Sequence, residues 1–341
     1  MLRTIAARLP ALAIAMLLVV GIVGLAAPEA AAQQINPRES TVMEDELLST
    51  LQSGGGVAGR VSIPDAGAGN LIKPDNKGWA SVQGTTLRVI SVVAVLGTLA
   101  LLAIFFAVRG RIRIDSGFSG RLIERFNGIE RFGHWLLAVS FVVLALTGLN
   151  FVIGRWVLMP VVGEQAFGTL SGWFKIAHNY MAFPFMLGLV WVFITWVSRN
   201  LPRKIDWEWL KMGGGLFSAG VHPPAGKFNA GQKLLFWMVI IGGAGLSYSG
   251  VIMLFPWMAA SPADWQFWQV IHALFAAFMS VVIFAHIYIG SVGMQGAFAA
   301  MGSGKVDENW AKEHHSLWVE EVREAERNGG AKAPSGATPA E

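Results

Sequence analysis

Seven histidines stand out in this chain, because imidazole is the side chain that most often ligates metals in proteins. Four of them lie inside stretches apolar enough to cross a membrane: His134, His178, His272 and His286. Burying an ionisable group in a bilayer costs free energy, so such a residue is a functional hypothesis by default. The alternative for a single one is a neutral imidazole bonded to a backbone carbonyl. Four together favour a ligand role.

Two of these histidines share the last apolar stretch. His272 and His286 are fourteen residues apart, which on a helix separates them by about 21 Å along the axis and about 40° around it. This distance is too large for one metal ion, but it suits two stacked haems, each held axially by one imidazole. The chain has no Cys. That excludes disulfides, cysteine-ligated iron–sulfur clusters, zinc–thiolate sites and covalent haem attachment.

The composition says which elements must position these side chains. Hydrophobic residues make up 54% of the 341 positions and charged residues only 14%, against about 25% charged in soluble proteins. A soluble enzyme and a disordered chain are excluded, and the formal net charge of +4 gives no argument for nucleic acid. Five stretches without Asp, Glu, Lys or Arg reach the length of roughly 20 residues that a membrane span requires. They are 89–108, 132–154, 176–198, 234–255 and about 266–293. Only helices satisfy their backbone inside such spans, so the expected class is all-α integral membrane.

Basic residues in the loops predict the orientation. Residues 109–131 and 199–233 each carry six Lys or Arg, whereas Arg155 and Lys175 are the only two in the two opposite loops. By the positive-inside rule the basic loops are cytoplasmic. We therefore expect a multi-pass protein of the bacterial inner membrane, with its mature N-terminus in the periplasm and its C-terminus in the cytoplasm.

Helix direction then pairs the four histidines by depth. His134 and His286 fall near the cytoplasmic side, and His178 and His272 near the periplasmic side. Arg131 and Lys175 each precede a histidine by three residues and so share its helix face, one turn nearer the water. Both cations are candidates for binding haem propionates. Ordinary snorkelling to the interface is the alternative.

The N-terminal region has a different character. Residues 1–32 read as a secretory signal peptide that is cleaved, with Arg3 and Arg8 before an apolar run and a small-residue site at Ala30–Ala32. An uncleaved membrane helix is the alternative, and both readings place residue 33 outside the cytoplasm. Residues 33–86 form a periplasmic arm rich in Gly, and 87–110 form an extra transmembrane helix. This helix either seals the bundle or docks a partner's anchor helix.

Residues 121–325 resemble the cytochrome b (gamma) subunit of respiratory formate dehydrogenases. More distant relatives are the di-haem cytochrome b anchors of hydrogenases and other molybdoenzymes. The loop Lys227–Lys233 and the tail around His314 are the most specific matches, because apolar helices do not require them. The matching segments are Arg131-Phe-Gly-His134-Trp135, Lys175-Ile-Ala-His178, Lys227–Lys233, Ile271-His272-Ala273, His286-Ile-Tyr288, Gly304-Lys-Val and Trp310-Ala-Lys-Glu-His314-His315.

The resemblance implies a four-helix di-haem cytochrome b bundle in residues 111–300, with one additional N-terminal transmembrane helix and a cytoplasmic tail in 301–341. Two b haems would be held by the pairs that depth predicts. A periplasmic molybdenum or tungsten (alpha) subunit would oxidise formate, and an iron–sulfur (beta) subunit would pass the electrons on. A quinone, menaquinone or ubiquinone, would accept them near the cytoplasmic haem.

The same resemblance places the quinone beside Asn229, Gly231 and Gln232, together with His286. An N-cap role for Asn229 before Ala230 is a second reading that is compatible with the first. His222 is interpreted as a solvated loop residue rather than a proton relay. For His314 and His315 we expect a solvated tail or a partner contact rather than ligation.

Two rival functions from other classes remain open. A proton-coupled transporter would use the buried histidines as relays, but it would bind no chromophore, and its helices would be expected to carry Asp or Glu. A purely structural anchor would need no intramembrane histidines. A hydrogenase anchor would show the same four histidines as a formate dehydrogenase anchor.

Overall fold

The computed structural model describes residues 52–53, 78–79, 81–217 and 220–328. The predicted signal peptide and most of the Gly-rich arm lie outside these residues. Five described helices are long and apolar enough to cross a membrane, which confirms the five expected spans. They run over Val82–Arg109, Gly128–Val157, Glu164–Arg199, Ala230–Leu254 and Pro262–Gly293.

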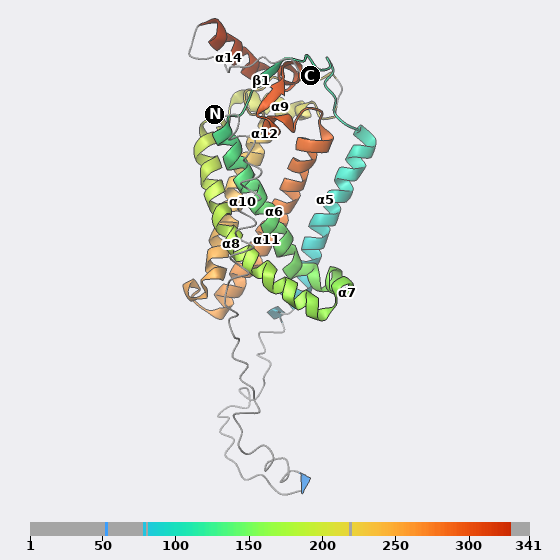
Figure 1. Cartoon of the computed structure of the whole chain (residues 1–341), viewed down its shortest axis with the longest axis vertical. Helices are drawn as coiled ribbons and strands as arrows, with labels where there is room; N and C mark the ends of the chain where they lie inside the picture. The colour runs from blue at the N-terminus through green and yellow to red at the C-terminus, as the bar shows by residue number, and fades with distance from the viewer. Residues whose placement is uncertain (1–51, 54–77, 80, 218–219, 329–341) are drawn as a thin grey trace.

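The long helices lie side by side and alternate in direction (Figure 1). Helix α6 packs against α8, α10 packs against α11, and α5 lies mainly along α11. The additional helix therefore covers one side of the bundle. The long helices are α5 (Leu87–Arg109), α6 (Gly128–Val157), α8 (Glu164–Trp196), α10 (Ala230–Leu254) and α11 (Pro262–Tyr288).

Short elements connect the long helices or cover their ends. Helix α5 continues a π-helical segment, η1, and α11 runs into another, η5. The short elements are η1 (Val82–Thr86), β1 (Leu122–Glu124), α7 (Met159–Val162), η2 (Val197–Arg199), α9 (Lys204–Lys211), η3 (Gly213–Gly215), η4 (Pro256–Met258), η5 (Ile289–Gly293), α12 (Ala299–Gly302), β2 (Lys305–Asp307), α13 (Glu308–His314) and α14 (Ser316–Arg327).

Several helices begin earlier than their apolar stretches because polar residues cap them outside the membrane. Asn127 caps α6: its side chain accepts from the backbone of Glu130, whose carboxylate accepts from Asn127 in return. This reciprocal capping box satisfies amides that have no partner within the helix. The π-helical segment Val82–Thr86 runs directly into α5, so the last residues of the predicted arm belong to the first membrane-spanning helix.

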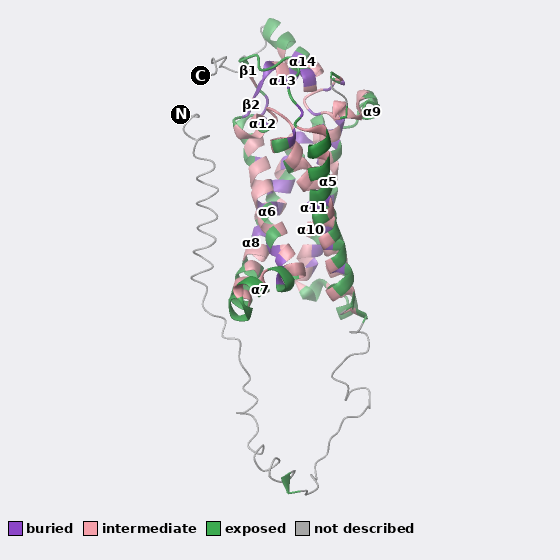
Figure 2. Ribbon diagram, turned by 90° about the vertical axis from the view of Figure 1, so that its right-hand side faces the viewer, coloured by how far each residue is buried: buried purple, intermediate pink, exposed green. Residues whose placement is uncertain are grey.

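Small residues allow the helices to approach closely. A Cβ atom on Gly188 of α8 would lie 2.8 Å from the backbone nitrogen of Leu137 on α6, and one on Gly242 of α10 would lie 2.5 Å from the sulfur of Met279 on α11. Contacts between small residues hold membrane helices together where the hydrophobic effect cannot. Exposed residues cover the outer surfaces of the long helices (Figure 2), as expected of surfaces that face lipid.

The C-terminal segment folds onto one end of the bundle. Strand β2 pairs antiparallel with β1, and Ile123 opposes Val306. Val306 is fully buried, and Trp310 of α13 and Trp318 of α14 are also buried. The expectation of a solvated tail is therefore wrong for residues 305–319, whereas most of residues 320–327 are exposed. The segment closes the end of the bundle that also carries both basic loops, opposite the end where Val82 begins the first helix (Figure 1).

Candidate functional site

The four intramembrane histidines form two pairs. The ring centroids of His134 on α6 and His286 on α11 are 6.1 Å apart, and those of His178 on α8 and His272 on α11 are 6.3 Å apart. In both pairs the rings are inclined by 65°. These are the partners that helix direction predicts from the sequence.

The spacing fits iron held between two imidazoles. An imidazole nitrogen lies about 2.0 Å from a bound metal, so two imidazoles on opposite faces of one haem place their ring centroids roughly 6 Å apart. A bare ion would need more ligands. In the part of the chain that the structure describes, no group of three or more His, Cys, Asp or Glu residues is placed to hold one. The donor set therefore favours a macrocycle with two axial imidazoles at each level.

A layer of apolar side chains separates the two levels. Met279 lies on α11 seven residues from both His272 and His286 and is 1% exposed. Phe141 of α6 and Phe185 of α8 are also buried, and their ring centroids are 6.3 Å apart. All three side chains also line the large cavity that reaches the His134–His286 pair.

Hydroxyl groups orient both histidines of the His178–His272 pair. We call it the outer pair because it lies toward the end of the bundle opposite the basic loops, and we call His134–His286 the inner pair. Thr147 Oγ1 lies 2.8 Å from Nδ1 of His178, and the same hydroxyl donates to the carbonyl of Val143 at 2.7 Å. A hydroxyl has one proton, so Thr147 accepts from the imidazole Nδ1–H. This leaves Nε2 as the free lone pair, which is the usual arrangement of a metal-binding histidine.

The second histidine of the outer pair repeats this arrangement. Ser249 Oγ lies 2.9 Å from Nδ1 of His272 and donates to the carbonyl of Gly245 at 2.7 Å. Each hydroxyl residue is followed by a glycine that faces the same ring: a Cβ on Gly148 or Gly250 would lie 3.4 Å from Cε1 of His178 or His272, respectively. Sequence reasoning missed both hydroxyls, because only the structure shows that Thr147 and Ser249 face a histidine.

The inner pair borders a large cavity. The cavity has a volume of about 1220 Å³ and is lined by both His134 and His286 but not by His178 or His272. The ring centroid of His134 lies 5.3 Å from that of Trp135 and 6.3 Å from that of Trp196. Its Nδ1 is buried and has no hydrogen-bond partner within the described residues.

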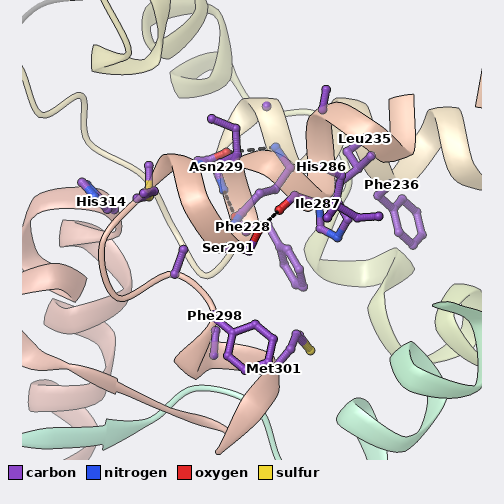
Figure 3. Close-up of a pocket in the computed structure, with 18 of the residues that line it drawn as sticks. Phe228, Asn229, Leu235, Phe236, His286, Ile287, Ser291, Phe298, Met301 and His314 are labelled. Carbon is purple, nitrogen blue, oxygen red and sulfur yellow. Dashed lines mark hydrogen bonds between the residues drawn. The ribbon is translucent and has the colours of Figure 1, made fainter. Parts of the chain in front are cut away.

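The predicted quinone residues line the same cavity as His286 (Figure 3). Asn229 is the N-cap of α10: its side chain accepts from the backbone of Gln232 at 2.9 Å, and Gln232 Oε1 accepts from the backbone of Asn229 at 3.1 Å. The N-cap reading of Asn229 is thus confirmed. A Cβ on Gly231 would lie 3.0 Å from the ring of Trp209, so this glycine lets α9 approach the start of α10.

A buried arginine, which sequence reasoning missed, also faces the cavity. Arg125 is 4% exposed, and its Nη2 donates to the carbonyl of Lys227 at 2.7 Å and to Gln232 Oε1 at 3.2 Å. Burial lowers the pKa of Arg125 to about 9, and nearby Glu130 acts in the opposite direction. The Glu130 carboxylate itself binds the Lys227 ammonium at 2.7 Å. Arg125 therefore has neutral hydrogen-bond acceptors, and it adds positive potential to this end of the cavity.

The two candidate propionate residues differ in their surroundings. Arg131 donates from Nε to the carbonyl of Met301 at 3.0 Å and also binds the carbonyls of Gly302 and Ser303. It caps the C-terminus of α12, where a cation interacts favourably with the helix dipole. Lys175 is exposed. A propionate contact remains a prediction for both residues.

The remaining three histidines cluster near the mouth of the cavity, and all three line it. His315 is 1% exposed, and its Nδ1 bonds to the carbonyl of Gly226 at 2.8 Å. The expectation that His315 is solvated is therefore wrong, because α13 and α14 bury it against the loop before α10. Burial lowers the pKa of His315 well below 6.5, and the charge of Arg125 acts in the same direction.

His314 and His222 are also placed against each other. Their ring centroids are 6.2 Å apart. His222 is an exposed loop residue, as expected, but its Nε2 lies 3.0 Å from Asp115 Oδ2. His314 is largely buried, and burial lowers its pKa to about 4. A solvated position is therefore wrong for His314 as well.

Comparisons with known proteins agree with this geometry. A family described as prokaryotic cytochrome b561 matches residues 125–304. The chain is 31% identical to the nitrate-inducible formate dehydrogenase cytochrome b556(Fdn) subunit of Escherichia coli over 212 residues, which are 60% of this chain and 94% of that protein. It is 31% identical to the formate dehydrogenase cytochrome b556(fdo) subunit of Escherichia coli over 205 residues, covering 59% of this chain and 93% of that protein.

A third relative is more distant. The formate dehydrogenase cytochrome b556 subunit of Haemophilus influenzae is 27% identical over 204 residues, which are 58% of this chain and 83% of that protein. The matched region contains all four paired histidines and the loop before α10. The chain therefore belongs to the prokaryotic cytochrome b561 family and is an all-α, multi-pass membrane cytochrome b, a class that binds haem b.

Proposed function

We propose that this chain is the membrane-anchoring di-haem cytochrome b subunit of a formate dehydrogenase. It passes electrons from an iron–sulfur subunit on the periplasmic side, through two b haems, to a quinone near the cytoplasmic side. The relatives support the choice of complex, because three of them are named as subunits of formate dehydrogenases. As the resemblance to formate dehydrogenase subunits implies, formate itself would be oxidised by a molybdenum or tungsten partner subunit.

The proposal rests on two imidazole pairs at different depths. Each pair has one histidine on α11 and the other on a different helix. His272 and His286 lie about 21 Å apart along α11, and each faces one histidine of another helix. Haem iron supplies reversible one-electron chemistry when it is bound. The chain's own residues hold each site, fix the outer imidazoles through Thr147 and Ser249, and fill the layer between the sites.

A haem held by His134 and His286 would fill the part of the cavity between them, and the part beside His286 and Asn229 is the proposed quinone site. Its wall is mainly apolar, and Asn229 and Gln232 contribute polar groups at the mouth. A few polar groups in an otherwise apolar pocket are what orients a small ligand with two carbonyl oxygens. The cavity lies at the end of the bundle with the two basic loops, which we assign to the cytoplasm by the positive-inside rule.

The test uses the intact complex purified with its partner subunits. Formate should reduce both haems, and addition of a short-chain quinone should reoxidise them, as followed by the absorption of reduced haem b. In a parallel reaction, molecular hydrogen (H2) replaces formate as the electron donor. Reduction by hydrogen but not by formate would assign the chain to a hydrogenase instead. A complex that lacks haem altogether would favour the transporter or the structural anchor.

A further inference from the structure

Three titratable side chains form a row on the cavity wall, from the exposed Asp115 and His222 to His314, whose Nε2 is buried. Asp115 lies in the segment after α5 and is exposed. Its Oδ2 lies 3.0 Å from Nε2 of His222, in the loop before α10. The ring of His222 lies 6.2 Å from the ring of His314, at the end of α13. Three separate parts of the chain therefore bring these groups together.

The innermost group of the row has an unused nitrogen. Nε2 of His314 is buried and has no hydrogen-bond partner among the described residues. His314 lines the same cavity as Asn229 and His286 (Figure 3). A buried polar atom without a partner costs free energy, so the arrangement is explained if this nitrogen faces a ligand or water within the cavity.

We propose that Asp115, His222 and His314 form the entry path for the protons that the quinone takes up in this cavity. This inference rests on the proposed function. Reduction of a quinone to a quinol takes up two electrons and two protons, one on each oxygen. The electrons come from formate through the partner subunits and the haems, and the protons come from water at the cytoplasmic surface. Each proton would pass from Asp115 to His222 and then, directly or through water, to His314 and the reduced quinone.

The other charged groups on the cavity wall are poorly suited to deliver protons. Arginine does not release its proton at physiological pH, which leaves out the four arginines on the wall, Arg109, Arg111, Arg113 and Arg125. His315 also lines the cavity, and its Nε2 has no partner among the described residues, but its Nδ1 is held by the carbonyl of Gly226 at 2.8 Å. The carboxylate of Glu313 accepts from the backbone amides of Asp115 and Ser116 at 3.0 and 2.9 Å. It therefore holds α13 against the segment that carries Asp115, and both of its oxygens are occupied.

The electrostatic surroundings of His314 fit a transient carrier. Burial is the main cause of its lowered pKa, His222 and Arg125 act in the same direction, and Glu313 opposes them. His314 is therefore neutral when it waits for a proton. A protonated His314 is more acidic here than an ordinary imidazolium, so it can release its proton to the more basic oxygen of a reduced quinone.

The test measures formate-dependent quinone reduction by the purified complex as a function of pH. Replacement of His314→Gln should lower turnover by roughly 10-fold to 100-fold, and the haems should become more reduced in the steady state because electrons wait for protons. A methylated imidazole added to the solution should restore part of the rate. His222→Gln should give a smaller loss that grows as the pH rises, because protons from bulk water become scarce.

The controls separate a proton path from a structural role. Lys312→Gln changes an exposed side chain of the same helix and should leave turnover unchanged. Haem content and haem potentials should remain as in the wild type in every variant. If both histidine variants reduce quinone at the wild-type rate across the pH range, the path is overturned and the proposed function remains intact. A loss of turnover that added imidazole does not restore would also overturn the path. If the complex with His314→Gln does not assemble, the path is tested by the pH dependence of turnover in His222→Gln, which replaces an exposed residue. A wild-type complex that does not reduce quinone contradicts the proposed function itself.

Discussion

The hydroxyl of Thr147 lies 2.8 Å from Nδ1 of His178 on the neighbouring helix. Because this hydroxyl donates its own proton to the carbonyl of Val143, it selects the tautomer in which Nε2 is the free ligand atom. Ser249 does the same for His272. Both imidazoles of this pair are thus oriented by a hydroxyl group that leaves Nε2 free.

This relationship predicts that Thr147→Val weakens the outer haem. The substitution keeps the size of the side chain but removes the acceptor for Nδ1–H, and loss of such a partner typically costs about 10-fold to 100-fold in affinity. Titration of the haem-depleted protein with haem measures the effect. The matched control is Thr195→Val, because Thr195 donates to a backbone carbonyl in the same way but faces no paired histidine. Equal haem affinity in Thr147→Val and Thr195→Val would show that the Thr147 hydroxyl serves only its bond to the backbone of its own helix.

The pairing by depth predicts which haem each histidine holds. His178→Ala or His272→Ala should remove the outer haem and leave the inner one largely in place, because the pairs are about 21 Å apart along α11. Haem content per polypeptide and the reduced spectrum give the answer. If either substitution removes only the inner haem, the assignment by depth is wrong.

Asn229 has two roles that suitable substitutions separate. Asn229→Ala should lower stability by about 1 kcal/mol, since the cap of α10 is lost, and should also impair quinone reduction while formate still reduces both haems. Asn229→Ser keeps a capping hydroxyl but lacks the amide. Impaired quinone reduction with normal stability in this variant would support a quinone contact. Normal quinone turnover in Asn229→Ser would show that Asn229 acts only as the N-cap of α10.

Gly133 lies where α6 meets α8, and a Cβ there would come within 2.2 Å of Cδ1 of Trp191. Gly133→Ala should therefore displace the indole, whose Nε1 bonds to the carbonyl of Ile129 at 3.2 Å. Such overpacking costs about 1–3 kcal/mol. Thermal unfolding in detergent checks this, with Gly97→Ala on α5 as the control, because nothing lies within 4 Å of a Cβ at that position. Equal melting temperatures for both variants would contradict the close approach.

The two tail histidines predict that docking of α13 and α14 depends on pH. Both have lowered pKa values in the folded state, about 4 for His314, so the undocked segment binds more protons. The stabilisation of the docked segment by these two groups is complete above the ordinary histidine pKa of 6.5, and it is lost as the pH falls toward the pKa of the folded state. The loss is up to about 1.4 kcal/mol per pH unit for each histidine. Amide exchange of residues 308–327 at about pH 7.5 and about pH 5, corrected for the intrinsic rate, measures this.

A matched variant isolates one of the two contributions. In His314→Gln the loss of protection on acidification should be smaller, because one proton-binding group has been removed while the other contacts of α13 remain. Identical pH dependence in the wild type and in this variant would mean that His314 does not titrate with docking.

The sequence was sufficient for the spans and for the partners of each histidine, because both follow from hydropathy and helix direction. The orienting hydroxyls were missed because Ser and Thr in membrane helices commonly bond to a carbonyl one turn back, as Ser140 and Ser280 do. Thr147 differs from Ser140 and Ser280 in that a histidine of the facing helix contacts its hydroxyl.

The folding of the tail was missed for a different reason. The segment is polar and rich in charge, and its burial depends on contacts distant in sequence: the pairing of β2 with β1 and the bond between His315 and Gly226. Arg131 illustrates the same limit. Its spacing from His134 suggested a role at the haem, whereas its guanidinium also caps α12, which lies far away along the chain.

The most direct test of the account is the reduced-minus-oxidised absorption spectrum of the purified wild-type chain, combined with quantification of its haem. We expect sharp b-type bands and two low-spin haems per polypeptide, because two imidazole pairs have the spacing that axial ligation requires. A colourless protein that still functions in its native complex would contradict the account.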